Sequence, residues 1–302
     1  MARLRVRRRV RAAARVIVSP DRWRSRLGYW GYGHVGRRFP QSPWSVRLHP
    51  SAPAVCNICG WAGSSFEGVR HSNEQRCISC GSIGRDRFLF WCMQQRVERP
   101  TTNELLRVLE TSPRMGEDYR SAMARWFDYT ASDFDERAHR ASIRIDLQDI
   151  ALPDASLDLI LTPHVLEHVP DTDGALAELH RVLAPGGRML IQVPILHGVT
   201  APPIEPEFHD DDTPVFWRFG PDLVDRLQAR GFETRLLCLR QWRDEVAVSH
   251  SENASPFPEF DVDSMLAGSR LDDLEPILDT PMAERLGLWE PCQFLVFEGV
   301  RP

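Results

Sequence analysis

From residue 104 onward, apolar stretches of strand length alternate with amphipathic stretches of helical length. Short apolar runs, typical of buried strands, occupy residues 105–110, 127–131, 142–146, 157–162 and 188–193. Helical patterns fall between them at 118–125 and 172–183, the second starting at Asp171 or Thr172 and stopping at Gly186 and Gly187. This alternation predicts a parallel sheet covered by helices on both faces.

The chain continues with a helix at 221–230 and a pair of strands at 232–239 and 293–300. Residues 243–290 interrupt that pair with a polar segment that contains several prolines. We expect this insertion to be a surface excursion or a lid. A further mixed apolar and basic helix is expected at 85–97, ahead of the first strand.

Two cysteine pairs precede that helix. Cys56, Cys59, Cys77 and Cys80 form a C-x2-C pair on each side of 17 intervening residues, and a glycine follows each pair. The spacing is typical of a four-cysteine zinc ribbon, in which the closed tetrahedral metal site is structural. Two unrelated pairs of buried cysteines are the alternative, and His71 is an alternative ligand. The other three cysteines lie in apolar surroundings and are expected in the core: Cys92, Cys238 and Cys292.

The first 50 residues are strongly basic. They hold 13 arginines and one acid, which leaves −17 for the rest of a chain whose net charge is −5. In residues 1–20, the spacing of Val6, Val10, Ala13 and Ile17 fits one face of a helix. Such an arm suits an anionic membrane surface or phosphates, and an extension without fixed structure is the alternative. Residues 28–54 have the composition of a linker.

Length and composition limit the class of protein. A chain of 302 residues suggests about two domains, and an odd count of seven cysteines argues against a secreted disulfide framework. No run of 18 apolar residues occurs, so we expect no membrane-spanning helix and a cytoplasmic protein, with peripheral contact at the inner membrane face left open. The expected divisions are a basic arm and linker (1–50), a zinc ribbon with its docking helix (51–99) and an α/β domain (100–302).

The candidate site begins where the first strand of the sheet ends. Glu110 closes that strand, a short loop follows to Gly116, and Asp133 lies 23 positions after Glu110 at the end of the second strand. An acid about 20 residues after a nucleotide-binding loop commonly binds a ribose. Ligands of open α/β sheets bind outside the carboxyl ends of the strands.

Three segments resemble the class I S-adenosylmethionine-dependent methyltransferases, and among them the type 11 group. Residues 152–160 enter the fourth strand, residues 164–169 are His-Val-Leu-Glu-His-Val, and residues 181–187 are Arg-Val-Leu-Ala-Pro-Gly-Gly. The resemblance covers about 104–240 and extends to 293–300. It implies a Rossmann-like, doubly wound, seven-stranded sheet, here preceded by a small zinc ribbon.

The resemblance also implies which residues bind the cofactor, S-adenosylmethionine. In the cofactor loop, Glu110 and Gly116 match the family pattern, whereas Ser112 and Arg114 stand where it has glycine. Glu110, Ser112 and Gly116 are then expected around the methionyl part of the cofactor. Asp133 is expected at the ribose hydroxyls, Asp146 at the adenine amino group and Leu147 against the adenine ring. For Asp133 and Asp146, a role as turn formers at strand ends is the alternative.

Three histidines are candidates for catalysis. His164 and His168 flank the end of the fourth strand, where the acceptor lies in the family, and His164 is also expected near the cofactor. Histidine suits a general base because its ordinary pKa is near neutrality. His209 belongs to an acidic loop at 205–212 that could supply a base, bind a divalent cation or simply be solvated. That none of the histidines does chemistry is the alternative.

Three functions remain open at this point. The first is O-methylation of a small molecule or a glycan, and the second is methylation of an RNA base by a ribbon-bearing enzyme. The acidic remainder of the chain disfavours nucleic acid as a partner, although the arginine-rich arm would suit it. The third is a non-catalytic interaction module that lost cofactor binding through Ser112 and Arg114. The sequence contains no indication of oligomeric state.

Overall fold

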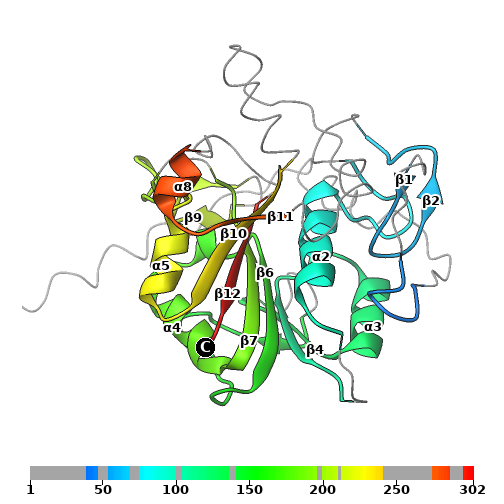
Figure 1. The fold of residues 1–302 in the computed structure, drawn as a ribbon, viewed down its shortest axis with the longest axis horizontal. Helices are drawn as coiled ribbons and strands as arrows, with labels where there is room; N and C mark the ends of the chain where they lie inside the picture. The colour runs from blue at the N-terminus through cyan, green and yellow to red at the C-terminus, as the bar shows by residue number, and fades with distance from the viewer. Residues whose placement is uncertain are drawn as a thin grey trace, which may run out of the picture. The chain divides into compact units, whose positions relative to one another are not determined.

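A mixed eight-stranded sheet forms the centre of the computed structural model (Figure 1). The structure describes residues 39–46, 54–68, 75–99, 104–135, 141–195, 199–209, 212–240, 274–285 and 295–302. In spatial order the strands are β11 (Leu274–Ile277), β10 (Glu233–Leu239), β12 (Val296–Val300), β7 (Leu183–Gln192), β6 (Leu157–Pro163), β3 (Arg107–Thr111), β4 (Asp128–Asp133) and β5 (Ile143–Arg144).

The predicted doubly wound sheet is confirmed. β5, β4, β3, β6 and β7 run parallel, whereas β12 pairs antiparallel with β7 and β10 antiparallel with β12. The central strands β3 and β6 are buried along nearly their whole length, as expected for parallel strands covered on both faces. The insertion is more than an excursion, because its described part contributes β11, an eighth strand that pairs with the edge of β10.

Two strands differ from their predicted bounds. β7 begins at Leu183 instead of residue 188, because the chain leaves α4 directly into extended structure. Gly186 there has a φ of +77°, and a Cβ on Gly187 would lie 2.7 Å from the Ala184 carbonyl oxygen, so both glycines serve this irregular start of the strand. The third predicted strand, 142–146, shrinks to the two residues of β5, which leaves Asp146 in a turn.

Helices cover both faces of the sheet (Figure 1). α2 (Gly84–Arg96) and α3 (Glu117–Trp126) lie on one side, and α4 (Thr172–Val182) and α5 (Leu223–Ala229) on the other. Asp171 caps α4 by accepting a hydrogen bond from the Gly174 N–H at 2.9 Å, as its position before the helix predicts. A short 3-10 helix, η1 (Leu166–His168), follows β6, and α8 (Thr280–Arg285) follows β11.

The segment expected to be a linker is partly built into the structure. Phe39 packs edge-on against Trp126, and Trp44 packs edge-on against Phe127. The Pro43 carbonyl accepts a hydrogen bond from Gln94 of α2. Residues 39–46 therefore belong to the core around α2 and α3, and Arg37–Pro302 forms one compact unit.

Two small hairpins complete the described structure. β1 (Ala54–Val55) and β2 (Ala62–Gly63) pair within the cysteine-bearing segment, and β8 (Glu207–Phe208) pairs with β9 (Pro214–Val215). Of the other sequence predictions, the basic arm, His71, Cys292 and residues 243–273 lie outside the described residues. Cys92 and Cys238 are fully buried, as expected. Among the helices that the structure describes, none is long and apolar enough to cross a membrane.

A buried glutamate of β12 connects α2 to the sheet. Glu298 of β12 has a side chain that is 1% exposed, and it accepts two hydrogen bonds of 3.0 Å from Arg96 in the last turn of α2. Arg188 of β7 also pairs with it, and Arg235 of β10 lies 3.7 Å away. One carboxylate therefore compensates three guanidinium groups.

Replacing this carboxylate should destabilise the fold strongly. Glu298→Ala leaves three arginines facing one another without their shared counter-charge, and we expect a loss of about 3–5 kcal/mol in the free energy of unfolding. Urea denaturation followed by circular dichroism measures it. As a control, Glu117→Ala removes an exposed partner of Arg120 and should cost no more than about 0.5 kcal/mol. Equal effects of the two variants would refute the structural role of Glu298.

Candidate functional site

The candidate site lies where the parallel strands end. From β3 the chain winds outward to β4 and β5, then returns to the other side of β3 to form β6 and β7. In such sheets the usual ligand position is at this reversal, outside the carboxyl ends of β3 and β6, and we refer to that position as the crevice. Four residues lie at these strand ends. Ser112 follows β3, Asp133 ends β4, His164 follows β6 and Gln192 ends β7.

The loop after β3 keeps its shape despite its missing glycines. Ser112 adopts a φ of +47°, the left-handed region that glycine occupies most easily, and its N–H donates to the Ser132 carbonyl at 2.7 Å. Gly116 begins α3, and no atom lies within 4 Å of the position where a Cβ would be. The backbone at Gly116 is therefore open on one side, with room for a ligand.

Glu110 is buried and held by two tyrosines. The Tyr129 hydroxyl donates to Oε2 at 2.7 Å, and the Tyr119 hydroxyl lies 3.2 and 3.3 Å from the two carboxylate oxygens. Burial raises the pKa of Glu110 to about 7, although both tyrosine hydrogen bonds favour its ionised form. Both carboxylate oxygens of Glu110 thus already have partners within the protein, and its expected contact with a cofactor stays a prediction.

Of the two acids expected at the nucleoside, Asp133 ends a strand and Asp146 lies in the turn after β5. Asp133 ends β4, is 8% exposed, and accepts a hydrogen bond from the Asp135 N–H on Oδ1 at 3.0 Å. Asp146 accepts two hydrogen bonds from Gln148, one from its backbone and one from its side chain. Each acid therefore holds a local turn through Oδ1, and its expected contact with a nucleoside stays a prediction. Leu147 is buried and belongs to the hydrophobic core.

His164 is held in an unusual backbone conformation at the end of β6. Its φ is +52°, and its N–H donates to the Gln192 carbonyl at 2.8 Å. The ring Nδ1 lies 3.5 Å from Glu167 Oε1, while Nε2 is buried and has no hydrogen-bond partner among the described residues. Burial lowers the pKa of His164 well below its ordinary value, and the charges of Arg85 and Arg114 lower it further. The ring is therefore neutral at pH 7.

Sequence reasoning missed Glu167 and Gln192 as site residues. Burial raises the pKa of Glu167, which lies between His164 and His168. Gln192 Nε2 donates to the Arg85 carbonyl at 3.1 Å, so the amide oxygen faces away from α2. In the described structure, buried side-chain atoms without a hydrogen-bond partner include Thr111 Oγ1, Thr162 Oγ1, His164 Nε2, Gln192 Oε1 and both carboxylate oxygens of Glu167.

These atoms all belong to the ends of β3, β6 and β7 or to η1. Buried polar atoms are rarely left without partners, so the cluster indicates a place for a ligand or for water. Glu167 could have been found from the sequence, because it belongs to the 164–169 motif. Gln192 could not have been identified from the sequence, because a glutamine at the end of a strand is common and does not indicate a functional site.

His168 and His209 lie together. His168 Nδ1 donates to the Pro214 carbonyl at 2.7 Å, and its ring meets the His209 ring edge-on at 4.8 Å. Glu207 in the same loop pairs with Arg218 at 2.8 Å, and Asp210 and Asp211 lie outside the described residues. Glu167 lies between His164 and His168 and so connects them. The His209 ring packs against His168.

The four cysteines of the predicted ribbon come together. The Sγ atoms all lie within 4.8 Å of one another, with Cys56–Cys80 and Cys59–Cys77 at 3.7 Å. A tetrahedral zinc with sulfur ligands at 2.3 Å requires about 3.8 Å between sulfurs, whereas a disulfide requires about 2.0 Å. The donor set therefore fits zinc. It is the one such group of His, Cys, Asp or Glu within the described ranges.

Each cysteine pair sits on a knuckle turn of the expected kind. Gly60 and Gly81 have φ values of +74° and +79°, and their N–H groups donate to the carbonyls of Cys56 and Cys77. Only glycine adopts this conformation without strain. The glycine after each cysteine pair is therefore required by the positive φ of the knuckle turn.

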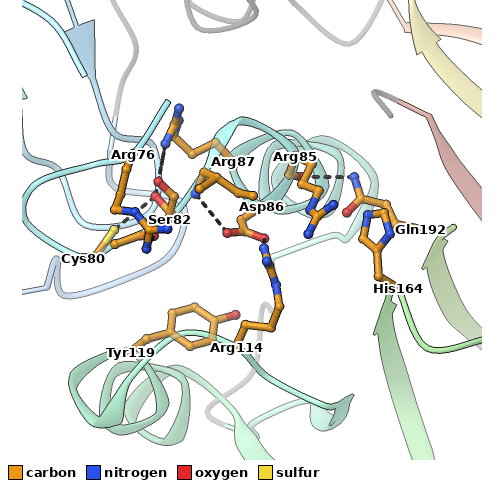
Figure 2. Close-up of polar contacts among 12 residues, drawn as sticks. Arg76, Cys80, Ser82, Arg85, Asp86, Arg87, Arg114, Tyr119, His164 and Gln192 are labelled. Carbon is orange, nitrogen blue, oxygen red and sulfur yellow. Dashed lines mark hydrogen bonds and ion pairs between the residues drawn. The ribbon is translucent and has the colours of Figure 1, made fainter. Parts of the chain in front are cut away.

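The first turn of α2 connects the cysteine cluster to the crevice (Figure 2). Arg87 is fully buried, donates to the carbonyls of Ser82 and Gln75, and lies 3.9 Å over the ring of Phe66. Asp86 pairs with Arg114 in the loop after β3, and the Arg85 carbonyl accepts from Gln192 at the end of β7. Of these contacts, the sequence indicated only that a helix at 85–97 docks the ribbon.

Part of this chain matches a known protein family. Residues 115–191 match the family model described as "Methyltransferase domain" (Methyltransf_11), a range that starts just after the loop residues 110–114. A 49-residue stretch is 47% identical to an uncharacterized 37.1 kDa protein in a transposon of Streptomyces fradiae. A stretch of the same length is 41% identical to a ubiquinone/menaquinone biosynthesis C-methyltransferase of Psychromonas ingrahamii. Each stretch covers 16% of this chain and only 14% and 20% of those curated proteins.

Solved structures with a similar arrangement include an S-adenosylmethionine-dependent methyltransferase from Mesorhizobium loti. It is 17% identical, with a TM-score of 0.39, covering 66% of this chain and 92% of that one. A possible histamine N-methyltransferase from Thermotoga maritima is 15% identical, with a TM-score of 0.41 over 72% of this chain and 91% of that one.

The family match falls within the parallel part of the sheet. Strands β5, β4, β3, β6, β7, β12 and β10 lie side by side in that order, and β12 pairs antiparallel with β7 and with β10. The matched residues run from the loop after β3 through β7, which is the half of the sheet that borders the crevice. Residues 115–191 are therefore similar to a methyltransferase domain.

The raised pKa of Glu110 predicts a pH-dependent stability. Its folded-state pKa of about 7 exceeds the ordinary 4.5, so its contribution is complete below about pH 4.5 and is lost as the pH rises through 7. Glu110→Gln cannot ionise, so from pH 5 to 8 the variant should gain about 2–3 kcal/mol in unfolding free energy relative to the wild type. Urea denaturation at several pH values tests this, and parallel profiles would contradict it.

Proposed function

We propose that this protein is an S-adenosylmethionine-dependent O-methyltransferase whose acceptor is a small molecule or a glycan. The observation that carries the proposal is the buried His164 Nε2, which has no hydrogen-bond partner in the described structure and lies at the crevice beside Gln192 and Glu167. The open backbone at Gly116 supports a cofactor on the neighbouring side of that crevice.

The cofactor would supply the electrophilic methyl group, and the residues at the strand ends fit it. Ser112 and Gly116 would line its methionyl part, with Asp133 at the ribose and Asp146 with Leu147 at the adenine. Asp133 and Asp146 each use Oδ1 in a local turn, which fixes the carboxylate in place. Both oxygens of Glu110 are engaged by tyrosines, so we assign it to shaping the loop rather than to direct contact.

His164 is our candidate for the general base. Its Nδ1 faces the buried Glu167 carboxyl at 3.5 Å, an arrangement that favours a proton on Nδ1 and leaves the Nε2 lone pair for an acceptor hydroxyl. Burial keeps the ring neutral, so this lone pair is available at pH 7. Gln192 Oε1 and the Glu167 oxygens also accept hydrogen bonds, which favours an acceptor molecule that carries hydroxyl groups.

Two variants should separate cofactor binding from methyl transfer. Asp133→Ala removes the ribose partner and should weaken binding of S-adenosylhomocysteine at least tenfold, about 1.4 kcal/mol, measured by titration calorimetry. His164→Gln should leave that affinity unchanged but lower transfer of label from S-adenosylmethionine to lysate fractions of the source organism by about 100-fold or more.

Two results would count against the proposal. If the wild-type chain produces no heat with either S-adenosylmethionine or S-adenosylhomocysteine, the non-catalytic module becomes the better description. If His164→Gln transfers label as fast as the wild type, His164 is not the base. Label recovered in RNA instead of in small molecules or glycans would favour the base-methylating alternative.

We also propose that Cys56, Cys59, Cys77 and Cys80 bind one structural zinc ion. Sulfur distances of 3.7 Å and knuckle turns on both pairs support this assignment. All four cysteines are buried and occupy every position of a tetrahedron, which leaves none open for catalysis. The ion would crosslink the two knuckles below the first turn of α2.

Elemental analysis of the purified chain should find one zinc per molecule. Cys77→Ser should lose most of the metal and lower the melting temperature, because a structural zinc contributes directly to folding. Cys92→Ser serves as the matched control, since Cys92 is a buried cysteine outside the cluster, and it should keep the full metal content. A wild-type protein that contains no zinc would overturn the assignment.

A further inference from the structure

Arg114 places a positive charge in the loop after β3. Its side chain is 24% exposed and reaches from the loop toward the first turn of α2, where it meets Asp86 (Figure 2). The proposed cofactor carries a sulfonium cation and would lie against this same loop. A lone guanidinium here would repel that cation, so its neutralisation matters to the proposed function.

Asp86 is well placed to neutralise Arg114. Its Oδ1 lies 2.5 Å from the guanidinium, and its Oδ2 accepts a hydrogen bond from the Ile83 N–H at 2.9 Å. Burial raises the pKa of Asp86, but the Arg114 charge and the Ile83 hydrogen bond outweigh this, so the net pKa is lowered. Asp86 therefore stays ionised, and its own helix fixes its position.

The neighbours of Asp86 hold that position from both sides. Arg87 donates to the Ser82 carbonyl at 2.6 Å, two residues after Cys80, and to the Gln75 carbonyl at 2.9 Å. The Arg85 carbonyl accepts from Gln192 at the end of β7. The carboxylate that meets the loop is therefore set in place by the cysteine cluster and by the sheet together.

We infer that Asp86 is a positioning residue that neutralises Arg114 and so lets the loop after β3 accept a cationic sulfonium. The inference rests on the proposed function. It makes the helix that follows the cysteine cluster part of the cofactor site, although no residue of that helix need touch the cofactor.

The two forms of the cofactor provide a specific measurement. S-adenosylmethionine carries the sulfonium charge and S-adenosylhomocysteine does not, while their carboxylate, amine, ribose and adenine are the same. The two ligands differ only in the methyl group on sulfur and the charge that it creates. A change between variants in the ratio of dissociation constants, Kd for S-adenosylmethionine over Kd for S-adenosylhomocysteine, therefore reports on how the site treats the sulfonium. General loosening of the loop would weaken both ligands alike and leave the ratio unchanged.

The experiment uses the full-length chain and titration calorimetry with both ligands. Asp86→Asn should raise the ratio by about tenfold, equivalent to about 1.4 kcal/mol, because Arg114 then faces the sulfonium unneutralised. Arg114→Met should lower the ratio, because Asp86 then stands as an uncompensated anion. The double variant should return close to the wild-type ratio. A zinc measurement on each variant checks that the cysteine cluster is retained.

Asp158→Asn is the matched control. Asp158 pairs with Arg107 at 2.6 Å at the opposite, amino end of β6, so its loss should leave the ratio unchanged. If Asp86→Asn and Arg114→Met both bind the ligands with the wild-type ratio, the inference is overturned. Should Asp86→Asn fail to fold, an unchanged ratio in Arg114→Met alone overturns it. A wild type that binds neither ligand is a different result, because it removes the proposed function itself.

Discussion

The docking of α2 on the sheet is the constraint on which the rest of the site depends. At its first turn, three consecutive residues reach three parts of the molecule: Arg87 the cysteine knuckles, Asp86 the loop after β3, and Arg85 the end of β7. At its last turn, Arg96 is fastened to the buried Glu298. Because α2 is held at both ends, it cannot shift without moving the residues at the crevice. The conformation of the loop after β3 therefore depends on residues far away in the sequence.

Much of the sheet could be predicted from the sequence because buried parallel strands are nearly continuous apolar runs. The runs at 105–110 and 157–162 became β3 and β6 with small changes of boundary. The glycine-flanked cysteine pairs predicted their own knuckle turns, since a positive φ leaves few alternatives to glycine. The start of α4 was likewise predicted at Asp171 or Thr172, and Asp171 is the N-cap. In each case a local rule and the tertiary structure required the same residue.

The remainder depends on contacts between distant segments, which no local pattern records. Trp44 and Phe39 appeared to lie in a linker because their partners, Phe127 and Trp126, are more than 80 positions away. β11 emerged from a polar insertion because an exposed sheet edge accepts backbone hydrogen bonds regardless of side-chain pattern. Ser112 and His164 adopt left-handed backbone conformations that their residue types disfavour, and only the surrounding structure holds them there.

The packing of Phe39 and Trp44 has a practical consequence for dissecting this protein. A cut at residue 100, where motifs suggest a natural border, would strip α2 from the sheet and expose its buried face, including Phe88, Trp91 and Met93. It would also remove Arg96, the partner of Glu298, and Trp44, which packs against Phe127. The smallest fragment expected to retain a native interior therefore starts before residue 39. The cysteine-bearing segment therefore packs into the same core as the sheet.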